Sequence, residues 1–298
     1  MGCSGRAAFA EERITLSGAW ALYPMAVKWA EEYTKINPGV KIDVSAGGAG
    51  KGMADCLAGI VEIGMVSRDI TKEEEGKGAY AVAVTKDAVV ATVNSGNPAI
   101  KEIAEKGLTK EAFAQIFIDG NIATWGDALG TGDKNTINVY TRSDSCGAGE
   151  SWAKYLGKKQ EDIAGLGVYG DPGVAQAVKS DVLGIGYNNI NFVYDNSTKK
   201  PLAGIQIVSI DINGNRVIDA EESFYGDRDS LTAAIAGGKY PSPPARELFF
   251  VTKGKSSNTT VEGFINWVLT EGQKYVEETG YVKLPKEMIE SELFDLGE

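Results

Sequence analysis

A short apolar strand, a turn of small residues and a helix follow one another three times in the first half of this chain, and this order limits the folds open to it. Strand patterns at residues 14–17, 40–44 and 137–140 lead into turns rich in Gly, Ala and Ser, and helical spacing of apolar residues follows each turn. Repeated strand–turn–helix units predict an α/β fold with an open, mostly parallel sheet, which binds ligands at the carboxyl ends of its strands.

Two later apolar runs predict that the first domain contains both chain ends. Residues 79–94, broken by Lys86-Asp87, lead out of the first domain, and residues 247–252 lead back. An amphipathic helix follows, and a last helix ends at Gly280, a natural C-cap. We therefore expect a two-strand hinge and three parts: an N-terminal tail at 1–12, a first domain at 13–86 plus 252–298, and an inserted second domain at 87–251.

The composition excludes several classes of function. The chain has 298 residues and a net charge of −11, which argues against binding to nucleic acid or to an acidic membrane surface. It has no run of about 18 apolar residues, so we expect no membrane span. The absence of His removes Ser-His-Asp and Cys-His catalysis and the usual zinc ligand sets. We expect no enzyme and no required cofactor.

The turn after residues 137–140 predicts an anion site. Arg142 stands at the carboxyl end of the strand, and residues 143–149 form a Ser- and Gly-rich turn before the next helix. A helix N-terminus presents unpaired N–H groups and a positive dipole end, and Arg adds a fork of donors suited to an oxyanion. An ordinary turn with a surface arginine explains the same residues, so both interpretations stay open.

The three cysteines have no metal-binding spacing. Cys56 has apolar helical neighbours and is expected in the core. Cys146 lies in the Gly-rich turn, where thiol pKa values can be low, so an enzyme that uses Cys146 remains an alternative. Cys3, between Gly2 and Ser4, looks like the end of a bacterial lipoprotein signal. It predicts lipidation of Cys3; an arbitrary tail is the alternative.

An ordered series of motifs resembles one family. The motifs are Ser17-Gly18-Ala19 through Tyr23-Pro24, Gly47-Gly48-Ala49-Gly50, Ile63-Gly64-Met65-Val66-Ser67-Arg68, Thr141-Arg142-Ser143-Asp144-Ser145-Cys146-Gly147 and Tyr240 to Leu248. From about residue 13 to 285 the chain resembles the phosphate-binding component of ABC-type phosphate importers. The resemblance implies a two-domain, type II periplasmic-binding-protein-like receptor outside the cytoplasm. It further implies a monomer that closes around inorganic phosphate and delivers it to a membrane permease.

The resemblance also implies the ligand-binding residues: Ala21, Leu22, Tyr23, Gly48, Ala49, Ser67, Arg68, Arg142, Ser145, Cys146, Gly147 and Ala148. Family members usually offer Ser and Thr hydroxyls in these loops, whereas this chain has Ala49, Cys146 and Ala148 there. Three lost hydrogen bonds to a charged group would cost about 4–9 kcal/mol, comparable with the roughly 8 kcal/mol of a micromolar complex.

Three explanations of these substitutions stay open. In the first, backbone N–H groups and arginines donate the hydrogen bonds that hydroxyls donate in other family members. In the second, the ligand is another oxyanion (sulfate, molybdate, tungstate) or a small organic acid. In the third, the chain is a receptor-like domain that no longer binds a ligand and acts in adhesion or signalling.

A separate polar segment partly matches a twelve-residue calcium loop. Positions 1, 3, 5, 9 and 12 of the loop hold Asp211, Asn213, Asn215, Asp219 and Glu222. Arg216 takes the place of the usual Gly at position 6, and residues 204–208 before the loop look like a strand rather than a helix. A structural calcium ion is one interpretation of this segment, and a polar hairpin is the other.

Overall fold

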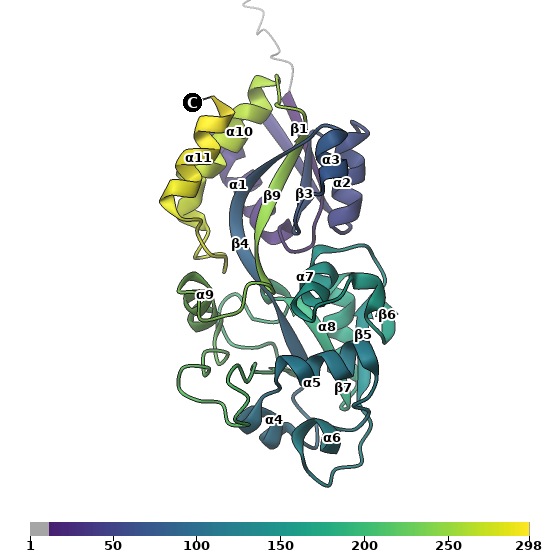
Figure 1. The fold of residues 1–298 in the computed structure, drawn as a ribbon. Coiled ribbons are helices and arrows are strands. Elements are labelled where there is room, and N and C mark those ends of the chain that lie inside the picture. Colours follow the sequence, from purple (N-terminus) through teal and green to yellow (C-terminus); the bar gives the residue numbers. More distant parts are fainter. Residues whose placement is uncertain (1–11, 298) are drawn as a thin grey trace, which may run out of the picture.

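The computed structural model describes residues 12–297, which form two lobes joined by two long strands (Figure 1). Each lobe has its own hydrophobic core. The core of lobe 1 draws on residues 14–84 and 248–281, and the core of lobe 2 draws on residues 88–245 with Val282. The chain therefore passes from one core to the other between Val84 and Ala88 and returns between Ala245 and Leu248.

Lobe 1 carries three parallel strands in the order β2 (Val40–Ala46), β1 (Glu12–Gly18) and β3 (Ile63–Val66). Its helices lie on both sides of this sheet, with α10 and α11 on one side and α2 and α3 on the other (Figure 1). They are α1 (Tyr23–Ile36), α2 (Ala49–Leu57), α3 (Lys72–Gly76), α10 (Thr259–Leu269), the 3₁₀-helix η4 (Glu271–Tyr275) and α11 (Lys286–Leu296).

Strands β4 (Ala79–Asn94) and β9 (Ala245–Lys253) are antiparallel partners that run through both lobes. In lobe 1, β9 pairs with β3, and in lobe 2, β4 pairs with β7 (Gly184–Asn189) and β8 (Ile205–Ile207). All of these pairs are antiparallel, so one mixed sheet connects the lobes. Side chains on both faces are buried along most of β4, which explains its long apolar sequence.

Lobe 2 completes its sheet with β5 (Asn138–Arg142), parallel to β7, and β6 (Leu166–Val168), parallel to β5. Its helices are α4 (Ile100–Lys106), α5 (Lys110–Ala114), the π-helix η1 (Gln115–Asp119), α6 (Trp125–Leu129), α7 (Gly147–Tyr155), the 3₁₀-helix η2 (Gln160–Asp162), α8 (Gly170–Ser180), the 3₁₀-helix η3 (Ile190–Phe192) and α9 (Arg228–Ala236). Both α7 and α8 begin beside the junction of the lobes (Figure 1).

The predicted two-domain α/β fold, with mixed sheets and a two-strand hinge, is confirmed. The predicted last helix is wrong: residues 271–275 form only a short 3₁₀-helix, Gly280 makes a turn with φ +89°, and α11 starts afresh after Pro285. The domain boundaries at 86/87 and 251/252 stay predictions. Within residues 12–297, no helix is both long and apolar enough to cross a bilayer. Cys3 and the tail before Glu12 lie outside the described residues.

The two-core arrangement makes a testable prediction about lobe 2. Phe117 is fully buried and packs edge-on against Trp152 and Tyr187, with ring centroids 5.6 and 5.9 Å away. We expect Phe117→Ala to lower the free energy of unfolding by about 3–5 kcal/mol in urea denaturation. Phe294→Ala is the matched control, because Phe294 is 78% exposed, and it should cost less than about 0.5 kcal/mol. Equal losses of unfolding free energy in the two variants would contradict the placement of Phe117 in the core of lobe 2.

Candidate functional site

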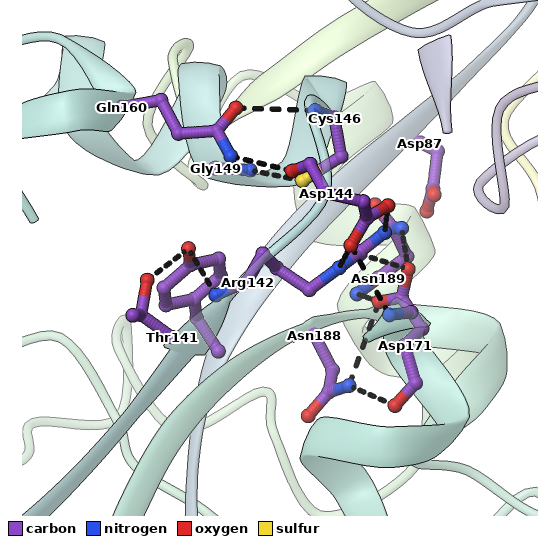
Figure 2. Close-up of polar contacts among 12 residues, drawn as sticks. Asp87, Thr141, Arg142, Asp144, Cys146, Gly149, Gln160, Asp171, Asn188 and Asn189 are labelled. Carbon is purple, nitrogen blue, oxygen red and sulfur yellow. Dashed lines mark hydrogen bonds and ion pairs between the residues drawn. The ribbon is translucent and has the colours of Figure 1, made fainter. Parts of the chain in front are cut away.

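Arg142, the last residue of β5, carries a buried charge at the junction of the lobes (Figure 2). Its Nε and Nη2 donate to the two carboxylate oxygens of Asp144, at 2.8 and 2.5 Å, and its Nη1 donates to Asp171 at 2.6 Å. Burial acts to lower the pKa of Arg142, but the carboxylates of Asp171 and Asp144 outweigh it and raise this pKa. A guanidinium has five N–H groups, so within the described part of the chain one on Nη1 and one on Nη2 remain for a further acceptor.

Asp171 is fixed in place by lobe 2. It lies in the first turn of α8, where a carboxylate is favoured by the helix dipole. Its Oδ1 accepts the backbone N–H of Asn189 at 2.8 Å, and its Oδ2 accepts the side-chain amide of Asn189 at 2.8 Å. Figure 2 shows Asp171 and Asn189 on the far side of the guanidinium from β5. Arg142 is therefore held from two elements, its own turn and α8.

The turn after Arg142 shapes the N-terminus of α7. Cys146 is the N-cap, and its Sγ accepts the backbone N–H of Gly149 at 3.3 Å, as a serine hydroxyl would. Gln160 braces the same turn, because its side chain accepts from the N–H of Cys146 and donates to the carbonyl of Asp144. Within residues 12–297, the N–H groups of Gly147 and Ala148 make no hydrogen bond, so they remain available to an anion.

The two predicted loops of lobe 1 differ in the donors that they offer. The N–H of Ala49, in the first turn of α2, is unbonded among the described residues. By contrast, the N–H groups of Leu22 and Tyr23 both donate to the carbonyl of Ala19 inside their own turn. We infer that the N–H of Ala49 is available to an anion and that those of Leu22 and Tyr23 are not.

The two lobes touch directly at glycines. A Cβ on Gly48, which has φ +95°, would lie 2.6 Å from the carbonyl oxygen of Ser145. A Cβ on Gly147 would lie 2.2 Å from the carbonyl oxygen of Ser67. The N–H of Gly50 also donates across the junction to Ser145, at 3.3 Å. These approaches bring the N-termini of α2 and α7 to the same place, and only residues without a side chain permit them.

The structure thus brings together the predicted residues around Gly48, Ser67 and Gly147, and the twelve predicted ligand residues differ in exposure. Ser145 is exposed, Tyr23 and Arg68 are half-buried, and the other nine are buried. A cleft of about 900 Å³ lies beside them, lined by both lobes and by β9; of the twelve predicted residues, Arg68, Arg142 and Ser145 line it.

Arg68 does not contribute to the Arg142 cluster in this structure. Its two terminal nitrogens donate to Glu74 at 2.9 and 2.7 Å, and its Nε lies 3.1 Å from Glu150 of lobe 2. Lys154 of lobe 2 likewise pairs with Asp69 of lobe 1 at 2.5 Å. Arg68 thus forms an ion pair that joins lobe 1 to lobe 2 across the cleft.

A second buried cation near Arg142 is Arg246, on β9. Its Nε donates to the carbonyl of Ser67 at 3.2 Å, and its Nη2 donates to the side chain of Asn189. Arg246 lies in one of the motifs that resemble the family, but the predicted ligand residues do not include it. They also omit Asp171 and Gln160. An acidic residue in the first turn of a helix was the available signal for Asp171, and for Gln160 we find none.

Cys146 has the environment of a structural cysteine. Burial, which outweighs the opposite effect of Arg142, raises the pKa of the Cys146 thiol to about 12. The thiol is therefore neutral at pH 7, whereas a cysteine nucleophile reacts as the thiolate. Cys56 is buried as well, and its thiol donates to the carbonyl of Val251 at 3.1 Å.

The polar loop at residues 211–222 is closed by its own side chains. Asp211 accepts the backbone N–H groups of Gly214 and Arg216, and Glu222 accepts that of Ile212 at 2.8 Å. Arg216 has φ +63°, the conformation that Gly usually takes at this position. Among residues 12–297, no group of three or more His, Cys, Asp and Glu is arranged to hold a metal. Calcium at Asp211, Asn213, Asn215, Asp219 and Glu222 stays a prediction.

Comparison with known proteins agrees with this architecture. The phosphate-binding protein PstS of Staphylococcus epidermidis is 28% identical over 287 residues, which cover 94% of this chain and 81% of that protein. PstS of Bacillus subtilis is 27% identical over 225 residues, covering 76% and 71%.

Solved structures show the same fold at low sequence identity. A substrate-binding protein from Clostridium perfringens with bound phosphate has a TM-score of 0.75 at 23% identity, covering 92% of this chain and all of that one. An ABC-type phosphate transport receptor from Vibrio cholerae has a TM-score of 0.66 at 21% identity, covering 91% and 100%. The family model of the PBP superfamily domain matches residues 6–271. The chain belongs to the PBP superfamily.

Proposed function

We propose that this protein is an extracytoplasmic receptor that binds inorganic phosphate between its lobes and delivers it to an ABC importer. The observation that carries the proposal is the placement of Arg142. Among residues 12–297, two of its N–H groups have no partner, and its side chain pairs with Asp144 in the turn that leads to α7. Relatives named as phosphate-binding proteins that match nearly the whole chain support the choice of phosphate.

The donors of such a site are mainly backbone groups. Ala49 and Ala148 have no hydroxyl, but the N–H groups of Ala49, Gly147 and Ala148 are free among the described residues. Each helix N-terminus adds roughly half a positive charge. Closure of the lobes removes water from the anion and strengthens each remaining bond. The function is binding without chemical conversion, and the neutral thiol of Cys146 supports this choice over catalysis.

The first test removes the guanidinium. Arg142→Ala deletes two charge-assisted donors at about 1.5–3 kcal/mol each, so we expect phosphate affinity to fall at least about a hundredfold by calorimetry. Arg142→Lys keeps the charge without the fork, and it should fold while it loses at least about tenfold. Arg13→Ala is the control, because Arg13 is exposed and pairs with Asp43 far from the cleft. Unchanged binding by Arg142→Lys and Arg142→Ala would refute the site.

The second test blocks closure. In Gly147→Ala the new methyl group meets the carbonyl of Ser67, so the lobes cannot approach fully. Overpacking of this kind costs about 1–3 kcal/mol, and we expect phosphate affinity to fall about 5- to 100-fold. Gly132→Ala is the matched control, since nothing lies within 4 Å of a Cβ built there. If both variants bind phosphate like the wild type, anion binding does not require this contact.

A further inference from the structure

The hinge contains a buried pair of charged residues. Asp87 of β4 and Arg246 of β9 are directly opposite in the register of the two strands. Asp87 lies between Val84 and Ala88, and Arg246 lies between Ala245 and Leu248. In these two intervals the chain passes from one hydrophobic core to the other. The side chain of Asp87 has no exposed surface, and that of Arg246 is 8% exposed. The two strands that join the lobes therefore carry a buried pair of opposite charges at the point where they pass between the cores.

This pair is incompletely bonded. Asp87 Oδ2 lies 3.7 Å from Arg246 Nη1, which is too long for a hydrogen bond. Within residues 12–297, neither oxygen of Asp87 nor Nη1 of Arg246 has a well-formed hydrogen bond. Figure 2 accordingly draws Asp87 beside the cluster without a dashed line. A buried carboxylate without hydrogen bonds is costly when it is ionised and much less so when it is protonated.

Arg246 connects this carboxylate to the candidate anion site. Its Nη2 donates to Asn189 Oδ1, and Asn189 Nδ2 donates to Asp171 Oδ2 at 2.8 Å. The same oxygen of Asp171 accepts from Arg142 at 2.6 Å. Arg246 also donates to the carbonyl of Ser67, the residue on which Gly147 closes. One continuous set of polar contacts thus runs from the hinge, through both lobes, to Arg142.

The titratable groups around Asp87 come from β9, from α8 and from the segment after η4. Arg246 of β9 faces Asp87 and favours its ionised form, whereas Asp171 of α8 disfavours that form. Burial raises the pKa of Tyr281, which follows η4, and the charge of Asp87 in turn contributes to this rise. Burial is the largest effect and raises the pKa of Asp87 to about 7. Arg142 and Arg246 carry two positive charges against three carboxylates, those of Asp87, Asp144 and Asp171. An anion beside Arg142 adds further negative charge to this set.

We propose that Asp87 takes up a proton from solvent when the anion binds, so that closure of the hinge around the anion is linked to protonation of the hinge. The inference rests on the proposed function, since it requires an anion next to Arg142. Negative charge entering the network disfavours the carboxylate form of Asp87. By linkage, protonation of Asp87 strengthens anion binding to the same extent that the anion strengthens protonation.

The test compares phosphate affinity at two pH values. Asp87→Asn imitates the protonated side chain, so we expect it to bind phosphate like the wild type at pH 6 and up to about tenfold more tightly at pH 8. Phosphate's own ionisation affects both proteins equally and cancels in the ratio. Asp119→Asn is the matched control, because Asp119 is exposed, and it should follow the wild type at both pH values. A ratio of affinities that is the same at pH 6 and pH 8 would overturn the inference.

A second measurement needs only the wild type and covers the case in which Asp87→Asn fails to fold. Infrared difference spectra at pH 8 should show the C=O band of a protonated carboxylic acid appearing as phosphate binds, and phosphate itself has no such band. Binding without this band would overturn the inference and leave the proposed function standing. A wild type that binds no phosphate at pH 6 or pH 8 would contradict the proposed function, and the inference with it.

Discussion

Arg142 carries its charge inside the protein, and the arrangement around the cleft depends on how that charge is held. An unpaired buried cation would be costly, and both Asp144 and Asp171 pair with Arg142. Their two negative charges exceed the single positive charge of Arg142. The N-termini of α2 and α7, each worth roughly half a charge, offset this excess. Because α2 belongs to lobe 1, the balance is complete only when the lobes meet.

The chain as a whole repels anions, with a net charge of −11. Anion binding therefore depends on donors that are fixed before the ligand arrives. Gln160 and the Cys146 cap hold the turn before α7, and Gly48 and Gly147 let the opposing loops approach. Where the family resemblance implies hydroxyls, we propose that this chain uses backbone N–H groups. Such groups cannot rotate away, which makes them pre-organised donors.

Local patterns in the sequence were sufficient for the fold and for the turn at Arg142. The strand at 137–140 and the Gly-rich turn after it are adjacent in the chain, so periodicity and turn composition predict them. Asp171 and Arg246 are 29 and 104 residues from Arg142, and only the folded sheet brings them near it. The hydrogen bond that occupies the N–H of Leu22 and the ion pair between Arg68 and Glu150 likewise depend on the folded structure, and no local sequence pattern predicts them. The last helix was misplaced because Gly280 ends a turn rather than a helix.

The most direct test of the account is a calorimetric titration of phosphate, sulfate, arsenate, molybdate and tungstate into ligand-stripped wild-type protein. We predict saturable binding of phosphate, and of arsenate as its close analogue, with little heat from sulfate. This result would mean that Arg142 and the backbone N–H groups replace the missing hydroxyls. Preference for molybdate or tungstate, or no binding of any of the five, would contradict a phosphate receptor.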